Sequence, residues 1–281
     1  MIQIQRELTV KRKNGFTLIE LLVVIAVIGL LLSIILPSLK KAKQKAQEIL
    51  CRSNLRQWGV LYTLYSQDYD GSLPVGWNGG TMWMTDLMAY YQGADDLRMC
   101  PSVKKFMSDI PGWDDPTANL DLTLAAWGVY GKPGFMGGEI PYWGQEGQYG
   151  SYGINAWALN PLDVGVPGTY NTEESWRPNY FRKMDVKNTS QIPLMAGAMW
   201  DGTHPWSNDP PPLSRGVQRD GSNMSVFCMD RHNGGPNMLF MDTSSRKVGL
   251  KELWILKWHK NFVRSGWTAG WPDWMQGYKE Y

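Results

Sequence analysis

The stretch "FTLIELLVVIAVIGLLLSIILP", residues 16–37, decides the fold of this chain. Up to Leu36 the residues that are not strongly apolar are Thr17, Glu20, Gly29 and Ser33. At about 1.5 Å per residue this run forms a helix of roughly 31 Å, which matches the hydrocarbon core of a bilayer. We therefore expect a membrane-spanning helix. A secretory signal peptide is the alternative, but the run exceeds the usual apolar length and no A-x-A-like cleavage site follows.

Glu20 is the one acid in this run. An acidic residue costs about 2.5–3.5 kcal/mol at the centre of an inserted helix and less near its end, so it usually has a partner. A cut between Gly15 and Phe16 would place a new α-amino group one helical turn from the carboxylate. The helix N-terminus also favours a negative charge. The cation could then belong to the same chain or to a neighbour.

The motif "KRKNG" followed by "FTLIELLVVIAVIGLLLSIILP" resembles the prepilin signature of type IV pilins and type II secretion pseudopilins. The resemblance implies that a prepilin peptidase cuts after Gly15, that Phe16 is N-methylated, and that Glu20 pairs with the terminal amine of an adjacent subunit. The family's helix-interior proline falls at Pro37. The implied partners are the peptidase, other pilin or pseudopilin subunits, inner-membrane lipid and assembly platform proteins.

The charges around the span leave its orientation open. Basic residues stand on both sides of it, at Arg6, Lys11, Arg12 and Lys13 before the span and at Lys40, Lys41, Lys43, Lys45 and Arg52 after it. The positive-inside rule therefore has no clear preference. The resemblance implies a cytoplasmic leader and a globular domain in the periplasm, as a single-pass inner-membrane protein or in a cell-surface filament.

A second helical pattern follows Pro37, whose ring should kink the helix because it clashes with the preceding turn. Apolar residues at spacings of three and four are Leu39, Ala42, Ala46, Ile49, Leu50, Leu55, Trp58, Leu61, Tyr62 and Tyr65. They form one face of an amphipathic helix, and "SQDYDGSLP" ends it with turn residues. We expect one nearly continuous helix from Phe16 to about Gln67. The expected divisions are a leader at 1–15, helix halves at 16–36 and 37–70, and a globular domain at 71–281.

The globular part combines many aromatic and turn-forming residues: the whole chain holds 15 tryptophans, 30 glycines and 17 prolines. We expect strands in 191–201 and 222–232, a hairpin within 237–250, and short helices in 81–91 and 251–262. Residues 109–180 are expected to be loop-rich. The prediction is a pilin-like α+β fold, in which a long N-terminal helix packs on a small antiparallel sheet. A net charge of +2 gives no indication of nucleic-acid binding, and the lysines after Pro37 are interpreted as a solvated face.

Four further motifs resemble a group of pilin-like proteins from planctomycete and verrucomicrobial relatives. They are "CRSNLRQWGVLYTLYSQDYDGSLP" at 51–74, "MCPS" at 99–102, "SYGIN" at 151–155 and "RHNGGPNMLFMDTSSRKV" at 231–248. The last resembles the group's His-x9-Asp-Gly motif, with His232 and Asp242 at the right spacing and Thr243 in place of glycine. We expect His232 to be a structural histidine, with Asp242 as its hydrogen-bond partner.

Cys51, Cys100 and Cys228 show no C-x-x-C spacing,. In an oxidising periplasm disulfides persist. A Cys51–Cys100 bond would join the long helix to the domain, and Cys100–Cys228 is the alternative pairing.

The sequence favours a structural role over catalysis. The three histidines, His204, His232 and His259, lie far apart in the sequence without H-x-x-x-H or H-x-H spacing,. A structural Ca²⁺ ion is a further candidate at "DYDG" (68–71) or "SNDP" (207–210), although neither is a full oxygen-ligand loop. The alternative function is a membrane-anchored module whose tryptophans bind polysaccharide, with "GWTAGWPDWMQGY" (266–278) as the candidate aromatic strip. Packing of the core is the competing explanation for these tryptophans.

Overall fold

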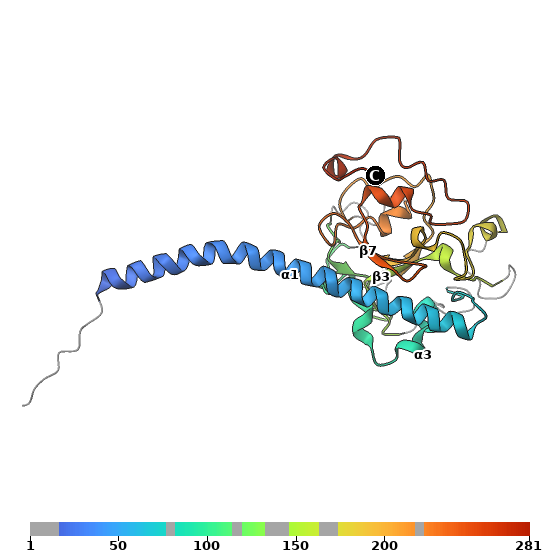
Figure 1. Ribbon diagram of the computed structural model, residues 1–281, viewed down its shortest axis with the longest axis horizontal. Coiled ribbons are helices and arrows are strands. Elements are labelled where there is room, and N and C mark those ends of the chain that lie inside the picture. Colours follow the sequence, from blue (N-terminus) through green and yellow to red (C-terminus); the bar gives the residue numbers. More distant parts are fainter. Residues whose placement is uncertain (1–16, 77–81, 114–119, 133–145, 163–173, 217–221) are drawn as a thin grey trace, which may run out of the picture. The chain divides into compact units, whose positions relative to one another are not determined.

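The computed structural model describes residues 17–76, 82–113, 120–132, 146–162, 174–216 and 222–281. The chain divides into two compact units, Met1–Lys45 and Ala46–Tyr281. One helix, α1, runs from Leu18 to Asp68 and therefore belongs to both (Figure 1). The expected continuous helix is confirmed to within two residues at its described start and one at its end. Pro37 lies inside α1, which remains helical through it.

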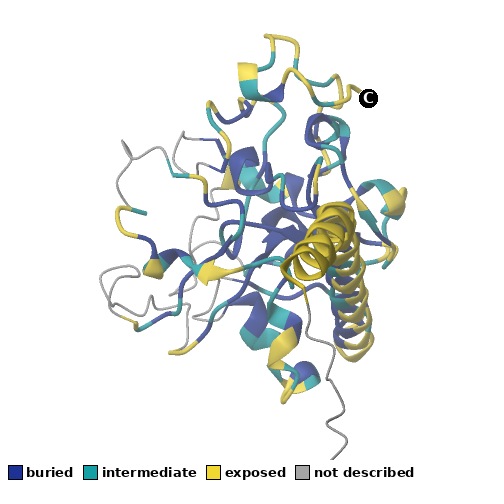
Figure 2. Cartoon of the chain, turned by 90° about the vertical axis from the view of Figure 1, so that its left-hand side faces the viewer, coloured by how far each residue is buried: buried dark blue, intermediate teal, exposed yellow. Residues whose placement is uncertain are grey.

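The second half of α1 carries only the later part of the amphipathic face that the sequence predicts. Leu55, Trp58, Leu61, Tyr62 and Tyr65 are buried, together with Cys51, whereas the earlier members Leu39, Ala42, Ala46, Ile49 and Leu50 are exposed. Figure 2 shows this buried side of α1 facing the strands, and an exposed side turned away from them. Because burial of apolar surface is the main driving force for packing, this face fixes the helix on its domain.

A five-stranded sheet has the order β5–β3–β4–β6–β7. Its strands in chain order are β3 (Tyr152–Asn155), β4 (Pro193–Gly197), β5 (Gly202–Thr203), β6 (Asn237–Phe240) and β7 (Ser245–Lys247). Neighbouring strands are antiparallel except β3 and β5, which are parallel. A separate parallel pair joins β1 (Lys105–Phe106) to β2 (Ala125–Ala126). A long helix on a small sheet confirms the predicted α+β class.

Two of the three strand predictions are confirmed. β4 lies within 191–201, and β6 and β7 form the expected hairpin. At the hairpin turn Thr243 adopts a φ of 63°, and the Asp242 carboxylate accepts a hydrogen bond from the Ser244 amide at 3.0 Å. Thr243 thus occupies a left-handed conformation that glycine would adopt without strain.

The strand expected in 222–232 is wrong, because Met224–Val226 form a 3-10 helix, η7. Its start is stabilised locally. The carbonyl of Ser222 accepts hydrogen bonds from the amide and the hydroxyl of Ser225, and the Asp209 carboxylate accepts one from the Met224 amide at 3.1 Å. Short polar side chains that bond to the nearby backbone favour turns over strands.

The other helices are short. The segment expected to form one helix at 81–91 forms two, α2 (Trp83–Asp86) and α3 (Met88–Tyr91), and the expected turn after 251 is η8 (Lys251–Ile255). The remaining 3-10 helices are η1 (Asp95–Arg98), η2 (Met107–Asp109), η4 (Ala156–Ala158), η5 (Glu174–Asn179), η6 (Thr189–Gln191) and η9 (Asp273–Met275).

The loop-rich segment 109–180 contains β3, which the sequence did not predict and which pairs with β4 and β5. Gly153 within it is required by close packing, since a Cβ there would lie 2.4 Å from the Trp200 carbonyl oxygen.

Trp58 is the largest α1 side chain in the core. It is fully buried, packs edge-on against Trp83 with ring centroids 5.3 Å apart, and donates its indole N–H to the Leu97 carbonyl at 2.9 Å. We predict that Trp58→Ala lowers the free energy of unfolding by about 3–5 kcal/mol, because it leaves a cavity and an unpaired carbonyl. Denaturant unfolding of the full chain in detergent measures this. Leu64→Ala is the matched control on the exposed side of α1 and should cost under about 0.5 kcal/mol,. Equal effects of the two changes would contradict the packing described.

Candidate functional site

The start of α1 forms a capping box. The Thr17 hydroxyl oxygen accepts a hydrogen bond from the Glu20 amide at 3.3 Å, and the Glu20 carboxylate accepts bonds from the Thr17 amide at 2.9 Å and the Thr17 hydroxyl at 2.7 Å. This reciprocal pattern satisfies two amides that a helix start otherwise leaves free. Glu20 therefore also stabilises the start of the helix of its own chain. Gly15 and Phe16 lie outside the described residues.

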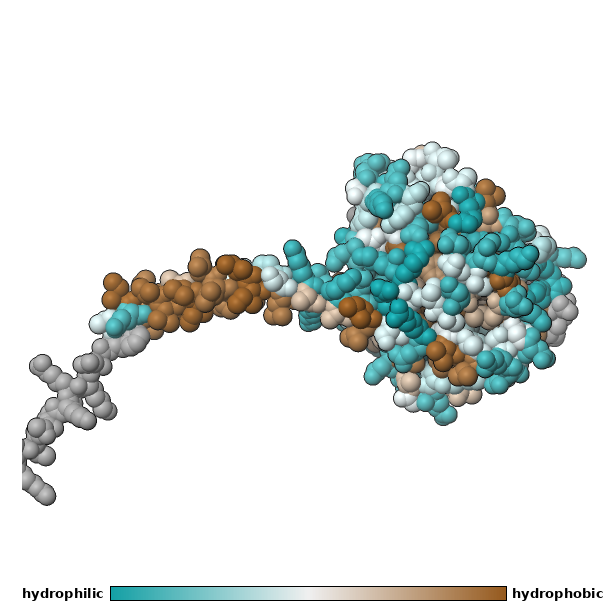
Figure 3. All heavy atoms as spheres, in the orientation of Figure 1, coloured by the Kyte–Doolittle hydropathy of each residue, from teal (hydrophilic) through white to brown (hydrophobic). Residues whose placement is uncertain are grey.

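The apolar half of α1 has no cover within the described part of the chain. Its large apolar side chains from Leu18 to Leu36 are between 47% and 80% exposed, and Figure 3 shows them as an almost continuous hydrophobic surface. Length and composition make α1 the candidate membrane span among the described helices. A surface of this kind requires lipid or other apolar helices around it.

Small residues interrupt this surface at two positions. A Cβ added at Gly29 would meet no atom within 4 Å. Four residues later, the Ser33 hydroxyl donates to the Leu30 carbonyl at 2.6 Å, which satisfies it inside the helix. Together they form a small-x-x-x-small pair, which allows another helix to approach closely. A kink at Pro37 remains a prediction.

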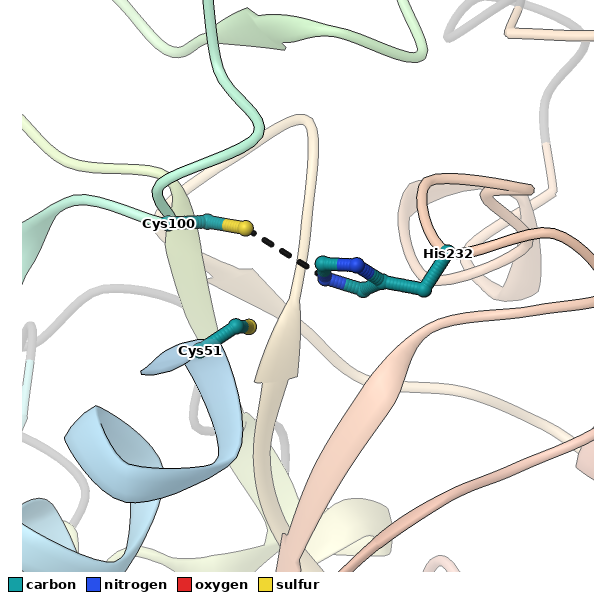
Figure 4. A group of neighbouring side chains, drawn as sticks. All are labelled: Cys51, Cys100 and His232. Carbon is teal, nitrogen blue, oxygen red and sulfur yellow. Dashed lines mark hydrogen bonds between the residues drawn. The ribbon is translucent and has the colours of Figure 1, made fainter. Parts of the chain in front are cut away.

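A second feature lies in the globular unit, where Cys51, Cys100 and His232 come together (Figure 4). Cys51 projects from α1, Cys100 from the loop that follows η1, and His232 from the turn before β6. Their ligand atoms lie within 4.8 Å of one another, and Cys100 Sγ is 3.3 Å from His232 Nε2. All three residues are buried.

Neighbouring polar groups hold the three side chains in place. The Ser151 hydroxyl accepts a bond from the Cys100 amide at 2.6 Å, and the Tyr152 hydroxyl donates to Cys51 Sγ at 3.3 Å. The Ser102 hydroxyl lies 3.5 Å from His232 Nδ1. The motifs at 51–55, 99–102, 151–155 and 231–232 thus converge on one place, which no spacing within a single motif reveals.

The two thiols have opposite electrostatic environments. Burial opposes ionisation of Cys100, but hydrogen bonds from Cys51 and His232 and the charge of Arg231 outweigh it and hold the pKa of Cys100 well below its usual range,. Burial and then the neighbouring Cys100 raise the pKa of Cys51. A thiolate beside an imidazole is also the arrangement of a cysteine nucleophile. Here Cys100 is only 1% exposed, whereas a reactive cysteine must reach its substrate,.

The predicted Cys51–Cys100 disulfide remains a proposal. The two sulfurs lie in the same cluster, and all three cysteines are free thiols in the structure. Cys228, the partner in the alternative pairing, is buried but does not belong to this cluster.

The predicted pair between His232 and Asp242 is wrong. The His232 ring faces Cys100 and Ser102, whereas Asp242 accepts hydrogen bonds from the amide and the hydroxyl of Ser244 in the hairpin turn. The ten-residue separation reflects two local roles at the two ends of β6: His232 lies in the turn before the strand, and Asp242 in the turn after it.

His204 and His259 lie in a different place, an aromatic cluster around Trp157. The Trp157 ring centroid is 4.6 Å from that of His204 and 5.1 Å from that of His259, and the Tyr180 hydroxyl lies 2.8 Å from His204 Nε2. Burial, and then the charge of His259, lowers the pKa of His204 to about 3. Burial lowers the pKa of His259 to about 4. Both rings are therefore neutral at physiological pH.

Carboxylates in both candidate calcium loops accept hydrogen bonds from protein groups. The Asp209 carboxylate accepts hydrogen bonds from the amides of Trp206 and Met224, and that of Asp68 accepts one from the Tyr90 hydroxyl. Across the described ranges, the Cys51, Cys100 and His232 cluster is the one group of three close metal-ligating side chains that the structure shows.

The described tryptophans mainly build the core. Fully buried are Trp58, Trp83, Trp127, Trp157, Trp254 and Trp258. Partly buried against the core are Trp113, Trp176, Trp200, Trp206, Trp267, Trp271 and Trp274. In the strip at 266–278, the indole N–H of Trp267 donates to the Gly270 carbonyl and that of Trp274 to the Pro212 carbonyl. These contacts favour the core-packing explanation over a polysaccharide platform.

Comparison with known proteins finds matches to the N-terminal segment. Residues 10–36 match the family model of the prokaryotic N-terminal methylation motif. A ComG operon protein 3 homolog from Bacillus licheniformis is 40% identical over 62 residues, which cover 22% of this chain and 64% of that protein. The N-terminal segment is of the type IV pilin and pseudopilin type. The chain spans less than two thirds of the length of this relative, and no solved structure gives a significant match.

The pKa values of the two aromatic-cluster histidines make stability depend on pH. Their folded pKa values lie below the unfolded value of about 6.5, so the unfolded chain binds more protons between about pH 6.5 and 4,. Stability should therefore fall as the pH falls through this window. We predict that His259→Asn reduces the loss between pH 7 and pH 5 by on the order of 1 kcal/mol. Denaturant unfolding at both pH values measures it, and an unchanged difference would contradict burial of a neutral His259.

Proposed function

We propose that this chain is a non-enzymatic structural subunit of a type IV pilus-like or type II secretion pseudopilus filament. The observation that carries this proposal is the two-part character of α1. Its second half buries one face in the globular unit, whereas its first half exposes apolar side chains on all sides. An exposed apolar helix is stable in a bilayer, and it is equally suited to packing against identical helices once it leaves the bilayer.

The proposed life cycle is the one that the resemblance to prepilins implies. The chain inserts with its leader in the cytoplasm and its globular unit in the periplasm, and a prepilin peptidase removes residues 1–15. N-methylated Phe16 then forms the new terminus, and the subunit joins others through residues 16–36 on an assembly platform. The methylation-motif match at residues 10–36 supports the processing step, because it spans the proposed cleavage point and the whole apolar run.

We predict that protein isolated from its native host has the intact mass of residues 16–281 plus one methyl group. A variant with Gly15→Val should retain residues 1–15, because a bulky residue would replace the glycine at the proposed cut. Intact-mass spectrometry of both proteins provides the test. A native mature terminus at any residue other than Phe16 would overturn the proposed processing.

Glu20 has two candidate roles that one pair of variants separates. Glu20→Gln can keep the capping box with Thr17, since glutamine also serves at this position, but it removes the charge,. Glu20→Ala removes both. We predict that both variants insert in the membrane and that both enter filaments poorly, because the proposed assembly contact requires the carboxylate charge.

Immunoblots of membrane and sheared-filament fractions measure insertion and incorporation separately. Thr17→Ala is the matched control, because it weakens the cap and leaves the charge of Glu20 in place. Normal incorporation of the Glu20→Gln protein would show that Glu20 acts as a helix cap, and would rule out pairing with a terminal amine.

A further inference from the structure

The cluster of Cys51, Cys100 and His232 has the geometry of a metal site. In a tetrahedral zinc site, Zn–S bonds of about 2.3 Å and Zn–N bonds of about 2.0–2.1 Å place the ligand atoms roughly 3.5–3.8 Å apart. Here Cys100 Sγ and His232 Nε2 are 3.3 Å apart, and the atoms of all three residues lie within 4.8 Å of one another. Movements on the order of 1 Å would therefore bring the three atoms to ligand distances. We propose that this cluster binds one Zn²⁺ ion.

The histidine is already oriented as a ligand. Nε2 points toward the sulfur, while Nδ1 lies 3.5 Å from the Ser102 hydroxyl. Lys247 holds the backbone on the same turn, since its ammonium group donates to the His232 carbonyl at 3.2 Å. Metal-bound histidines usually have such a partner on the second ring nitrogen, which fixes the tautomer and the ring orientation.

The two cysteines also have supporting contacts, one to the backbone of Cys100 and one to the sulfur of Cys51. The Cys100 amide donates to the Ser151 hydroxyl at 2.6 Å, and Tyr152 donates to Cys51 Sγ at 3.3 Å. The Arg231 guanidinium, next to His232 in the sequence, is fixed by hydrogen bonds to the carbonyls of Ser151 and Ala125, each at 2.7 Å. Thiolate is the form of cysteine that binds a metal.

A buried asparagine lies beside the cluster. Asn237 is fully buried next to Cys51 and donates its amide to the Glu48 carbonyl at 3.0 Å. Its Oδ1 atom has no hydrogen-bond partner among the described residues. A buried acceptor without a donor costs free energy.

The ligand types select the metal. Two sulfurs and one imidazole suit Zn²⁺, whereas Ca²⁺ and Mg²⁺ require oxygen ligands. The site would join three segments that are far apart in the sequence. Zinc binding would release the thiol protons, and the free energy of zinc binding would contribute to the stability of the fold. A Cys51–Cys100 disulfide is the competing state, since the two sulfurs cannot bind zinc as thiolates while bonded to each other.

The test uses the full chain, purified in detergent without air and loaded with Zn²⁺. Mass spectrometry of the bound metal should find one zinc per chain. Competition with a chromogenic chelator should show affinity at least ~100-fold weaker in Cys51→Ser, Cys100→Ser and His232→Ala, since each lacks a ligand. Ser102→Ala removes only the contact to Nδ1 and should weaken binding about 10–100-fold. Cobalt substitution should give a thiolate-to-metal absorption band in the wild type.

Cys228→Ser is the matched control, because Cys228 is also buried but lies outside the cluster, and it should bind zinc like the wild type. If a cysteine variant fails to fold, the zinc affinity of Ser102→Ala still tests the proposal, since Ser102→Ala leaves all three ligands in place. Wild-type affinity in His232→Ala or Ser102→Ala would overturn the proposal. A Cys51–Cys100 disulfide in protein isolated without reductant would also overturn it, whatever the reduced chain binds.

Discussion

The burial of one face of α1 is the constraint on which the globular unit depends. Trp58 fills the core, and at Gly59 the sheet approaches so closely that a Cβ would lie 3.1 Å from Leu239. Polar residues of α1 add a second kind of contact. Gln47, Asn54 and Trp58 donate to the carbonyls of Pro101, Met99 and Leu97. An irregular segment without strand partners needs such donors, since buried carbonyls must be satisfied. The helix therefore serves as the template for the loop that carries Cys100.

Sequence patterns predicted the parts of this fold that local spacing determines. The 3.6-residue period after Pro37 predicted the buried face of α1 from Leu55 to Tyr65 but wrongly extended it back to Leu39, and the residues around the turn at Thr243 predicted the β6–β7 hairpin,. The sequence patterns did not predict the elements whose conformation depends on tertiary contacts. β3 is only four residues long within a loop-rich region, and its place between β4 and β5 depends on pairing with distant segments. In 222–232, the hydrogen bonds that the Ser222 carbonyl and the Asp209 carboxylate accept outweigh the preference for a strand,.

In the candidate site, too, the sequence indicated the individual residues but not the contacts between distant segments. Cys51, Cys100 and His232 were each recognisable from a short motif, yet the motif that contains His232 suggested the wrong partner, because Asp242 lies closer in sequence than Cys100. Their convergence requires three independent backbone placements, by α1, by the loop after η1 and by the turn before β6. Glu20 is a local counterpart: its bonds to Thr17 could have been predicted from the T-x-x-E pattern itself,.

The cluster lies near the start of the part of α1 that belongs to the globular unit. The globular unit begins at Ala46, and contacts from α1 to distant segments start immediately after it, with Gln47 to Pro101, Arg52 to Ser245 and the Cys51 contact to Tyr152. Detachment of a packed helix starts at the end of its buried face, where local opening costs the least free energy. The proposed zinc site would join α1 to two further segments at Cys51 and would stabilise the contact that opens first, whereas the same bond near Tyr65 would leave that end free to fray.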